Sequence, residues 1–136
     1  MSDLTGMKIL LVDDTPANID VLRRILGNEG LEISVAMNGE TTLTLVGKNR
    51  PDLILLDVMM PGIDGFETCE RLKADPDTRN IPIIFVTAKT DLEDVVRGFK
   101  VGGVDYITKP FKREEVLSRA KTHLSIKRLI QEQELL

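Results

Sequence analysis

The sequence predicts an α/β protein in which helices cover both faces of a parallel β-sheet. Five apolar, strand-like runs alternate with helix-like segments, and this alternation is typical of a doubly wound sheet. The run from Leu53 to Leu56 consists of large aliphatic residues, which is the pattern of a central parallel strand that is buried on both faces. A chain of 136 residues is long enough for one such domain.

Local signals place the strands and the first two helices. The strands are expected at about residues 7–12, 31–36, 53–57, 82–87 and 104–107. Thr15, followed by a proline, provides an N-cap for the first helix, and Gly30 marks its predicted end. The second helix is expected at residues 39–48, where Leu43 and Val46 are the apolar anchors among unfavourable threonines.

Capping-box patterns predict the starts of the third and fourth helices. Asp64 is followed by Glu67, and Thr90 by Glu93, at the capping-box spacing. We expect Gly102-Gly103 to end the fourth helix. Each helix has an apolar edge that we expect to be buried, formed by Phe66, Cys69 and Leu72 in the third and by Val95, Val96 and Phe99 in the fourth.

The last helix begins after Pro110 and shows no stop signal. About 25 helical residues would span roughly 37 Å, more than packing on a small sheet requires. The residues expected to face the sheet are Val116, Leu117, Ala120 and Leu124. Beyond them, Ile126, Leu129 and Leu136 are spaced as alternating a and d positions of a short coiled-coil seam, with Gln133 at one a position. We therefore expect the extension 125–136 to be a linker or a dimerisation segment that is helical only when paired.

Composition excludes several classes of protein. The net charge of −4 argues against nucleic acid as a direct partner of this domain, and the single cysteine, Cys69, excludes an internal disulfide. Because no apolar run is long enough to span a membrane and the start of the chain does not resemble a signal peptide, we expect no membrane partner and a cytoplasmic location. The expected parts are a flexible N-terminus (1–6), one domain (7–124) and the C-terminal extension.

Polar residues lie at the ends of four of the five expected strands. Asp13 and Asp14 follow the first strand, Asp57 ends the third, Thr87 ends the fourth, and Lys109 lies just beyond the fifth. Because ligands bind outside the carboxyl ends of parallel strands, we expect these side chains to share one crevice. Clustered carboxylates require protons or a cation, and oxygen ligands favour Mg²⁺.

This set of side chains fits phosphoryl transfer to a carboxylate. An aspartate can accept a phosphoryl group and form an acyl phosphate, for which the protein mainly supplies positioning and charge neutralisation. Asp13 and Asp14 would hold Mg²⁺, Thr87 would donate a hydrogen bond, and Lys109 would pair with a phosphoryl oxygen.

Each of these residues also has a purely structural interpretation. A strand-end aspartate is commonly a turn former, Thr87 could be a satisfied strand-end hydroxyl, and Tyr106 could be core packing. We expect Cys69 to be a core residue and Asp64 to be a helix cap. The only histidine, His123, is expected to be solvated or to interact with the helix dipole near the end of the last helix, and not to be catalytic. A phosphohistidine donor must therefore come from another molecule or domain.

Together the motifs resemble the receiver domain of two-component response regulators, the CheY-like superfamily. The matching segments are residues 9–14, 51–57, 60–65, 86–88 and 105–110. They occur in order between residues 7 and 124. The resemblance implies a flavodoxin-like, five-stranded parallel sheet of order 2-1-3-4-5. It also implies a cis bond between Lys109 and Pro110.

The resemblance further implies the role of each site residue. Asp57 would accept a phosphoryl group from a histidine kinase or a phosphotransfer protein. Asp14, Asp57 and the carbonyl oxygen of Met59 would bind Mg²⁺ directly, whereas Asp13 would act largely through water. In addition, Thr87 and Tyr106 resemble a switch pair, in which the hydroxyl group moves toward the phosphoryl group and the aromatic ring turns inward.

Other functions remain as alternatives. A hydrolase of the haloacid dehalogenase kind also uses a strand-end aspartate with Mg²⁺, but its Asp-x-Asp-x-Thr motif differs from the contiguous Asp13, Asp14 and Thr15. A nucleotide-binding domain would carry a glycine-rich loop after the first strand, and a pseudo-receiver that only docks partners would lack some of the polar site residues. We therefore expect a phosphorylation-activated signalling switch, not a turnover enzyme, that controls an output domain or a partner.

Overall fold

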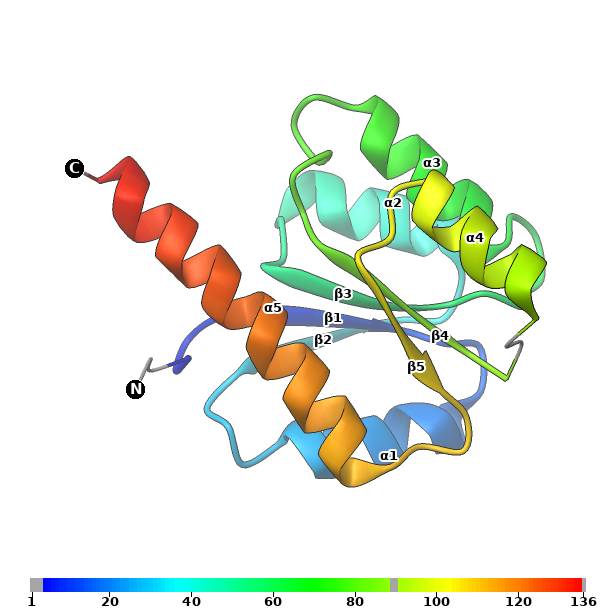
Figure 1. Ribbon diagram of the computed structural model, residues 1–136, viewed down its shortest axis with the longest axis horizontal. Coiled ribbons are helices and arrows are strands. Elements are labelled where there is room, and N and C mark those ends of the chain that lie inside the picture. Colours follow the sequence, from blue (N-terminus) through cyan, green and yellow to red (C-terminus); the bar gives the residue numbers. More distant parts are fainter. Residues whose placement is uncertain (1–3, 89–90, 136) are drawn as a thin grey trace.

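The computed structural model describes residues 4–88 and 91–135. Strands and helices alternate along this part of the chain (Figure 1). The strands are β1 (Lys8–Val12), β2 (Glu32–Ala36), β3 (Leu53–Asp57), β4 (Ile83–Thr87) and β5 (Asp105–Thr108). The helices are α1 (Pro16–Leu26), α2 (Gly39–Lys48), α3 (Gly65–Ala74), α4 (Leu92–Lys100) and α5 (Arg113–Glu134).

The strands form one parallel sheet of order β2-β1-β3-β4-β5. Helices α1 and α5 cover one face, and α2, α3 and α4 lie on the other (Figure 1). Every residue of β3 and β4 is buried, because apolar side chains from both helical layers pack on these central strands. The structure therefore confirms the doubly wound, flavodoxin-like fold.

The structure confirms the predicted N-cap residues of α1 and α3 but not the predicted end of α1. Asp64 caps α3, since its carboxylate accepts a hydrogen bond from the Glu67 N–H at 2.9 Å. Thr15 stands at the N-cap of α1 as predicted, without a side-chain capping bond. The prediction that Gly30 ends α1 was wrong, because the helix ends at Leu26 where a Gly-Asn pair of poor helix formers follows.

Gly30 has a different role near the N-terminus. It adopts a positive φ of 75° in the turn before β2, and its carbonyl accepts a hydrogen bond from the Gly6 N–H at 2.9 Å. Leu4 is buried in the core beneath α1 and α5. Leu4 and Gly6 thus contact the domain, while the expected flexibility of segment 1–6 stays a prediction.

The prediction for α4 was wrong in two respects. The N-cap residue is Asp91, and Thr90 lies outside the described residues. The apolar edge is largely exposed, with 41% of Val96 and 50% of Phe99 accessible to solvent. The physical reason is that α4 approaches the sheet through Gly98, so the bulky apolar side chains stand beside the contact instead of within it.

Helix α5 extends well beyond the sheet (Figure 1). Val116, Ala120 and Leu124 are buried, and Leu117 packs against them, as predicted. The helix continues to Glu134 in a single chain, so the expectation that residues 125–136 are helical only when paired was wrong for the part that the structure describes. One reason is that the extension contacts its own domain, where the Gln131 side-chain amide donates a hydrogen bond to Asp52 at 3.0 Å.

No helix within the described residues is both long and apolar enough to cross a lipid bilayer.

Candidate functional site

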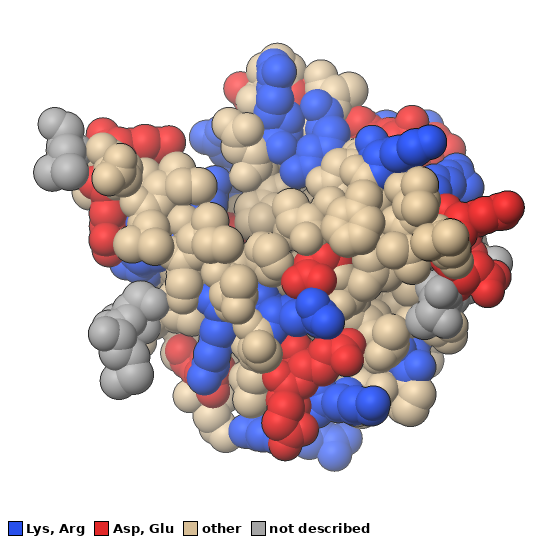
Figure 2. All heavy atoms as spheres, in the orientation of Figure 1, with Lys and Arg blue, Asp and Glu red and all other residues tan. Residues whose placement is uncertain are grey.

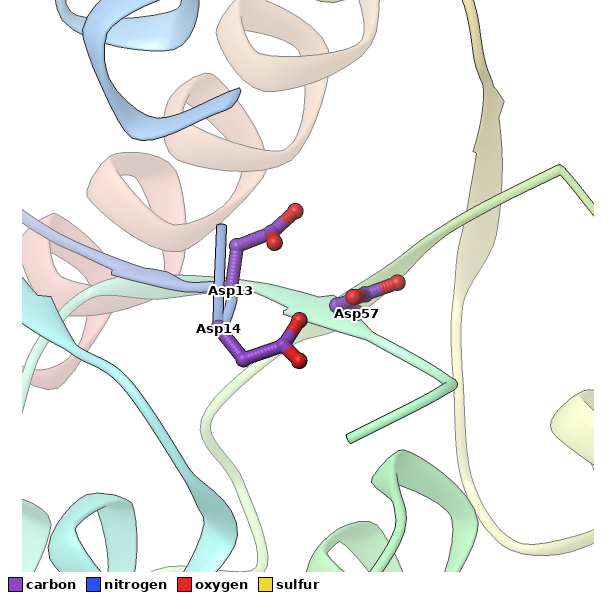
Figure 3. Close-up of side chains that lie close together, drawn as sticks. All are labelled: Asp13, Asp14 and Asp57. Carbon is purple, nitrogen blue, oxygen red and sulfur yellow. The ribbon is translucent and has the colours of Figure 1, made fainter. Parts of the chain in front are cut away.

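Three carboxylates meet at the carboxyl edge of the sheet (Figure 3). Asp13 and Asp14 directly follow β1, and Asp57 ends the neighbouring strand β3, with Val12 aligned with Leu56. Carboxylate oxygens of the three residues lie within 4.8 Å of one another. Asp13 and Asp57 are only 1% and 3% exposed, whereas Asp14 is exposed. The parallel register therefore brings the predicted acidic residues together.

Lys109 joins two of these carboxylates. Its amino nitrogen lies 3.2 Å from Asp13 Oδ2 and 3.2 Å from Asp57 Oδ1. Burial lowers the pKa of Lys109, but the charges of Asp57 and Asp13 more than offset this effect and raise the pKa above its usual value. Lys109 is therefore a permanent positive charge at the site, in the position where it was predicted.

The electrostatics of Asp57 oppose its ionisation. Burial is the main cause that raises the pKa of Asp57 to about 6, and the charge of Asp13 adds to this, while Lys109 lowers it. Asp14 contributes a smaller increase. A cation beside the three carboxylates would remove this penalty, because an adjacent positive charge favours the ionised form. The oxygen-only donor set suits a hard cation such as Mg²⁺.

The two adjacent aspartates are held differently. Asp13 Oδ1 accepts hydrogen bonds from the Thr15 N–H at 2.9 Å and from the Asn18 side-chain amide at 3.3 Å. Among the described residues, Asp14 makes no hydrogen bond or ion pair. Asp13 is thus oriented by the start of α1, and Asp14 keeps its oxygens available. The sequence reasoning missed Asn18, and the only signal was its place in the first turn of the helix that follows the acidic pair.

Thr87 lies at the same edge of the sheet. It ends β4, is buried, and its backbone carbonyl accepts a hydrogen bond from the Lys109 N–H at 3.0 Å. The peptide bond between Lys109 and Pro110 is cis, as the resemblance implied. Met59 follows two residues after Asp57 and is 58% exposed. These positions agree with the sequence-based site, while the role of each residue stays a prediction.

Tyr106 is not part of the carboxylate cluster. Its ring packs between Phe85 and Phe99, with centroid distances of 5.8 Å and 5.6 Å. Its hydroxyl group donates a hydrogen bond of 2.6 Å to the backbone carbonyl of Asp94 in α4. The structure therefore ties the predicted switch tyrosine to α4, a contact that local sequence did not indicate.

Two further predictions concern residues outside the cluster. Cys69 is buried, and burial raises the pKa of its thiol to about 11, as suits an unreactive core residue.

The expectation for His123 was wrong, because the helix continues past it and its ring lies 3.0 Å from Asp105. Burial raises the pKa of Asp105, but hydrogen bonds from His123, the Tyr106 N–H and Arg119 more than offset this and lower it.

Comparisons with known proteins agree with this arrangement. Residues 9–121 match the response regulator receiver domain family. The chain is 42% identical over 125 residues to the response regulator PleD of Caulobacter vibrioides, which covers 92% of this chain and 28% of that protein. It is 43% identical over 122 residues to the DNA-binding response regulator MtrA of Mycolicibacterium smegmatis, which covers 90% of this chain and 52% of that protein.

Solved structures show the same likeness. The signal receiver domain of a signal transduction histidine kinase from Syntrophus aciditrophicus superposes with a TM-score of 0.81 and 40% identity, covering 88% of this chain and 91% of that one. The chemotaxis response regulator CheY4 of Vibrio cholerae gives a TM-score of 0.82 and 30% identity, covering 88% and 99%. Because the family match spans the sheet edge from Asp13 to Lys109, the chain belongs to the receiver domain family of two-component response regulators.

Proposed function

We propose that Asp57 is the phosphoryl acceptor of this receiver domain. The observation that carries the proposal is a buried carboxylate at the end of β3, in contact with Lys109 and beside two further carboxylates. A carboxylate oxygen of Asp57 would attack the phosphorus of a phosphohistidine on a histidine kinase or a phosphotransfer protein. The bond from phosphorus to the histidine nitrogen breaks, and the nitrogen keeps the electron pair. Uptake of one phosphoryl group from acetyl phosphate tests the proposal.

The neighbouring side chains would stabilise the charge that moves during transfer. Lys109 is already 3.2 Å from the acceptor oxygen, so its ammonium group can pair with a phosphoryl oxygen without a large rearrangement. Thr87 ends the adjacent strand and would donate its hydroxyl hydrogen to another phosphoryl oxygen. In this scheme Thr87 and Tyr106 form the switch that carries the change of state to α4 and β5.

The acidic cluster fits a magnesium site. Asp14, Asp57 and the carbonyl oxygen of Met59 would hold the ion directly, and Asp13 would act through an intervening water. When bound, Mg²⁺ supplies positive charge that neutralises the phosphoryl oxygens. The hydrogen bonds and ion pair of Asp13 support its indirect role, because they already occupy its oxygens.

Replacement of Asp14 by alanine should weaken Mg²⁺ binding more than replacement of Asp13. We expect Asp13→Ala to lose about tenfold in affinity, the low end for an outer ligand partner, and Asp14→Ala to lose more because a direct ligand disappears. Calorimetric titration of both variants with Mg²⁺ measures the difference. Weaker binding by Asp13→Ala than by Asp14→Ala would reverse the two assignments.

We propose that the domain works as a regulatory switch in the cytoplasm and not as a turnover enzyme. Its chemistry would be limited to its own phosphorylation and dephosphorylation, and its conformational change would control an output domain or a separate partner. The chain spans between about a quarter and about half of the length of PleD and MtrA, so the nature of the output is part of the proposal.

We further propose that a second copy of the chain pairs along residues 126–136. Figure 2 shows uncharged side chains gathered on the C-terminal half of α5, where Ile126, Leu129 and Ile130 are exposed. Ile126 and Leu129 lie on the side of the helix opposite Gln131, which contacts the domain, and Ile130 lies about 100° from Gln131 around the helix.

This pairing should be weak, because the seam is shorter than two heptads. Sedimentation of the full chain at high concentration is expected to show a concentration-dependent dimer, and a version ending at Ser125 is expected to stay monomeric. Identical monomer masses for the two forms would exclude the dimer.

A further inference from the structure

Helix α4 approaches strand β5 at Gly98, which is the one buried residue of this fully described helix. The hydroxyl group of Tyr106 occupies the space that a side chain at position 98 would fill. A Cβ atom added to Gly98 would overlap the Tyr106 hydroxyl oxygen and lie 2.8 Å from Cζ of the same ring. It would also lie 3.1 Å from Cδ2 of Phe85. The close approach of ring and helix therefore requires glycine at this position.

Several contacts hold Tyr106 in this place. Its hydroxyl group donates to the carbonyl of Asp94, four residues before Gly98 on the same helix. The ring packs on Phe85 and Phe99. Burial raises the pKa of Tyr106, the charge of Asp94 adds to this, and a backbone hydrogen bond with Gly98 opposes it. The hydroxyl group is thus a protonated donor at neutral pH.

We propose that Gly98 is a positioning residue of the switch, and that the lack of a side chain there opens a slot on α4 for the Tyr106 hydroxyl group. The inference rests on the proposed function, because it treats Tyr106 as the switch partner of Thr87. In this scheme the ring in the slot is the inward position of the switch. If the phosphorylated state favours that position, then a side chain that fills the slot must disfavour phosphorylation by the same coupling free energy.

The ring, and not the helix, is expected to yield when the slot is filled. Phe85 is fully buried and cannot retreat. The carbonyl of Gly98 accepts a hydrogen bond from the Gly103 N–H at 2.9 Å, which ties this end of α4 to the loop before β5. Tyr106 is only half-buried, and rotation about its side-chain bonds moves the hydroxyl group into solvent.

Tyrosine fluorescence gives a direct readout, since the chain has one tyrosine and no tryptophan. Quenching by acrylamide should be stronger in Gly98→Ala than in the wild type, because the Tyr106 ring becomes exposed. The matched control is Gly47→Ala, which makes the same change in helix α2 at a position where an added Cβ has no atom within 4 Å. We expect the control to match the wild type. Unchanged quenching in Gly98→Ala would overturn the proposal.

Phosphorylation tests the link between the slot and the switch. If acetyl phosphate reacts with the conformation that has the inward ring, the initial rate of labelling in the presence of Mg²⁺ follows the population of that conformation. We expect this population, and with it the rate, to fall about fivefold or more in Gly98→Ala, at the low end of common coupling factors, and to be unchanged in Gly47→Ala. An exposed Tyr106 with a wild-type labelling rate would contradict the positioning role. Failure of the wild type itself to be labelled would instead count against the proposed function, while the quenching result would still test the slot.

A second variant keeps the test decisive if Gly98→Ala does not fold. The double variant Gly98→Ala with Tyr106→Ala removes the side chain that the new methyl group meets. It should fold and show the circular dichroism of the Tyr106→Ala single variant. A double variant that also fails to fold would show that glycine is required for a reason other than Tyr106, and the proposal would be abandoned.

Discussion

Asp57→Asn is expected to abolish phosphoryl uptake from acetyl phosphate in the presence of Mg²⁺. Asparagine keeps the size of the side chain, but it lacks the negatively charged carboxylate oxygen that attacks phosphorus. Asp13 is not expected to take over this role, because it is held by hydrogen bonds from Thr15 and Asn18 and by Lys109. In the proposed site Asp14 is a direct ligand of Mg²⁺ and not an acceptor. Intact-protein mass spectrometry should show one added phosphoryl group in the wild type and none in the variant.

The control for this experiment is Asp64→Asn. Asp64 is the next aspartate after Asp57, and it caps α3 through a hydrogen bond from the Glu67 N–H. Asparagine is an equally good N-cap residue, so this variant should fold and be labelled like the wild type. Equal labelling of the wild type and Asp57→Asn would show that Asp57 is not the acceptor.

Asp57→Asn should also stabilise the metal-free protein above about pH 6. The pKa of Asp57 rises from its ordinary value of 3.8 to about 6 in the folded protein, chiefly because of burial. The folded state therefore binds the proton more tightly than the unfolded state, so this group lowers the stability as pH rises from about 4 to about 6. Full ionisation of Asp57 above this range lowers the free energy of unfolding by up to about 3 kcal/mol.

Asparagine removes this cost, and Lys109 keeps its ion pair with Asp13 at 3.2 Å. Urea unfolding in a chelator should show the largest gain for Asp57→Asn at about pH 8 and little gain at about pH 4. Saturating Mg²⁺ should reduce the gap, because the ion binds and stabilises the folded wild type. A variant that is no more stable than the wild type at about pH 8 without metal would refute the electrostatic account.

Local sequence was sufficient to predict the range of an element when the signals that define the element lie within or beside it. Strand β3 and helix α2 occupy the predicted ranges 53–57 and 39–48. In β3, the continuous apolar run can be satisfied only by burial on both faces. In α2, Asn38 accepts a hydrogen bond from the Thr41 N–H and so defines the first turn. These signals lie within a few residues of the elements that they determine.

Local sequence was misleading where a distant contact decides the outcome. The helical spacing of Val95, Val96 and Phe99 predicted a buried edge, yet α4 meets the sheet through Gly98 because Tyr106 occupies the adjacent space. His123 was expected to be solvated, but strand β5 places Asp105 beside it. Neither partner is close in sequence, so no pattern on a single element could reveal the contact.

The sequence by itself determined which residues stand at the carboxyl ends of the strands, since four of the five apolar runs are followed by a polar side chain and parallel pairing brings those ends to one edge. That was enough to predict Asp13, Asp14, Asp57, Thr87 and Lys109 as one group. Only the tertiary structure decided how they are held, because these contacts depend on the relative placement of separate elements. Asn18 orients Asp13 from α1, and Lys109 reaches Asp13 and Asp57 from beyond β5. The same dependence on long-range packing places the Tyr106 hydroxyl group against Gly98.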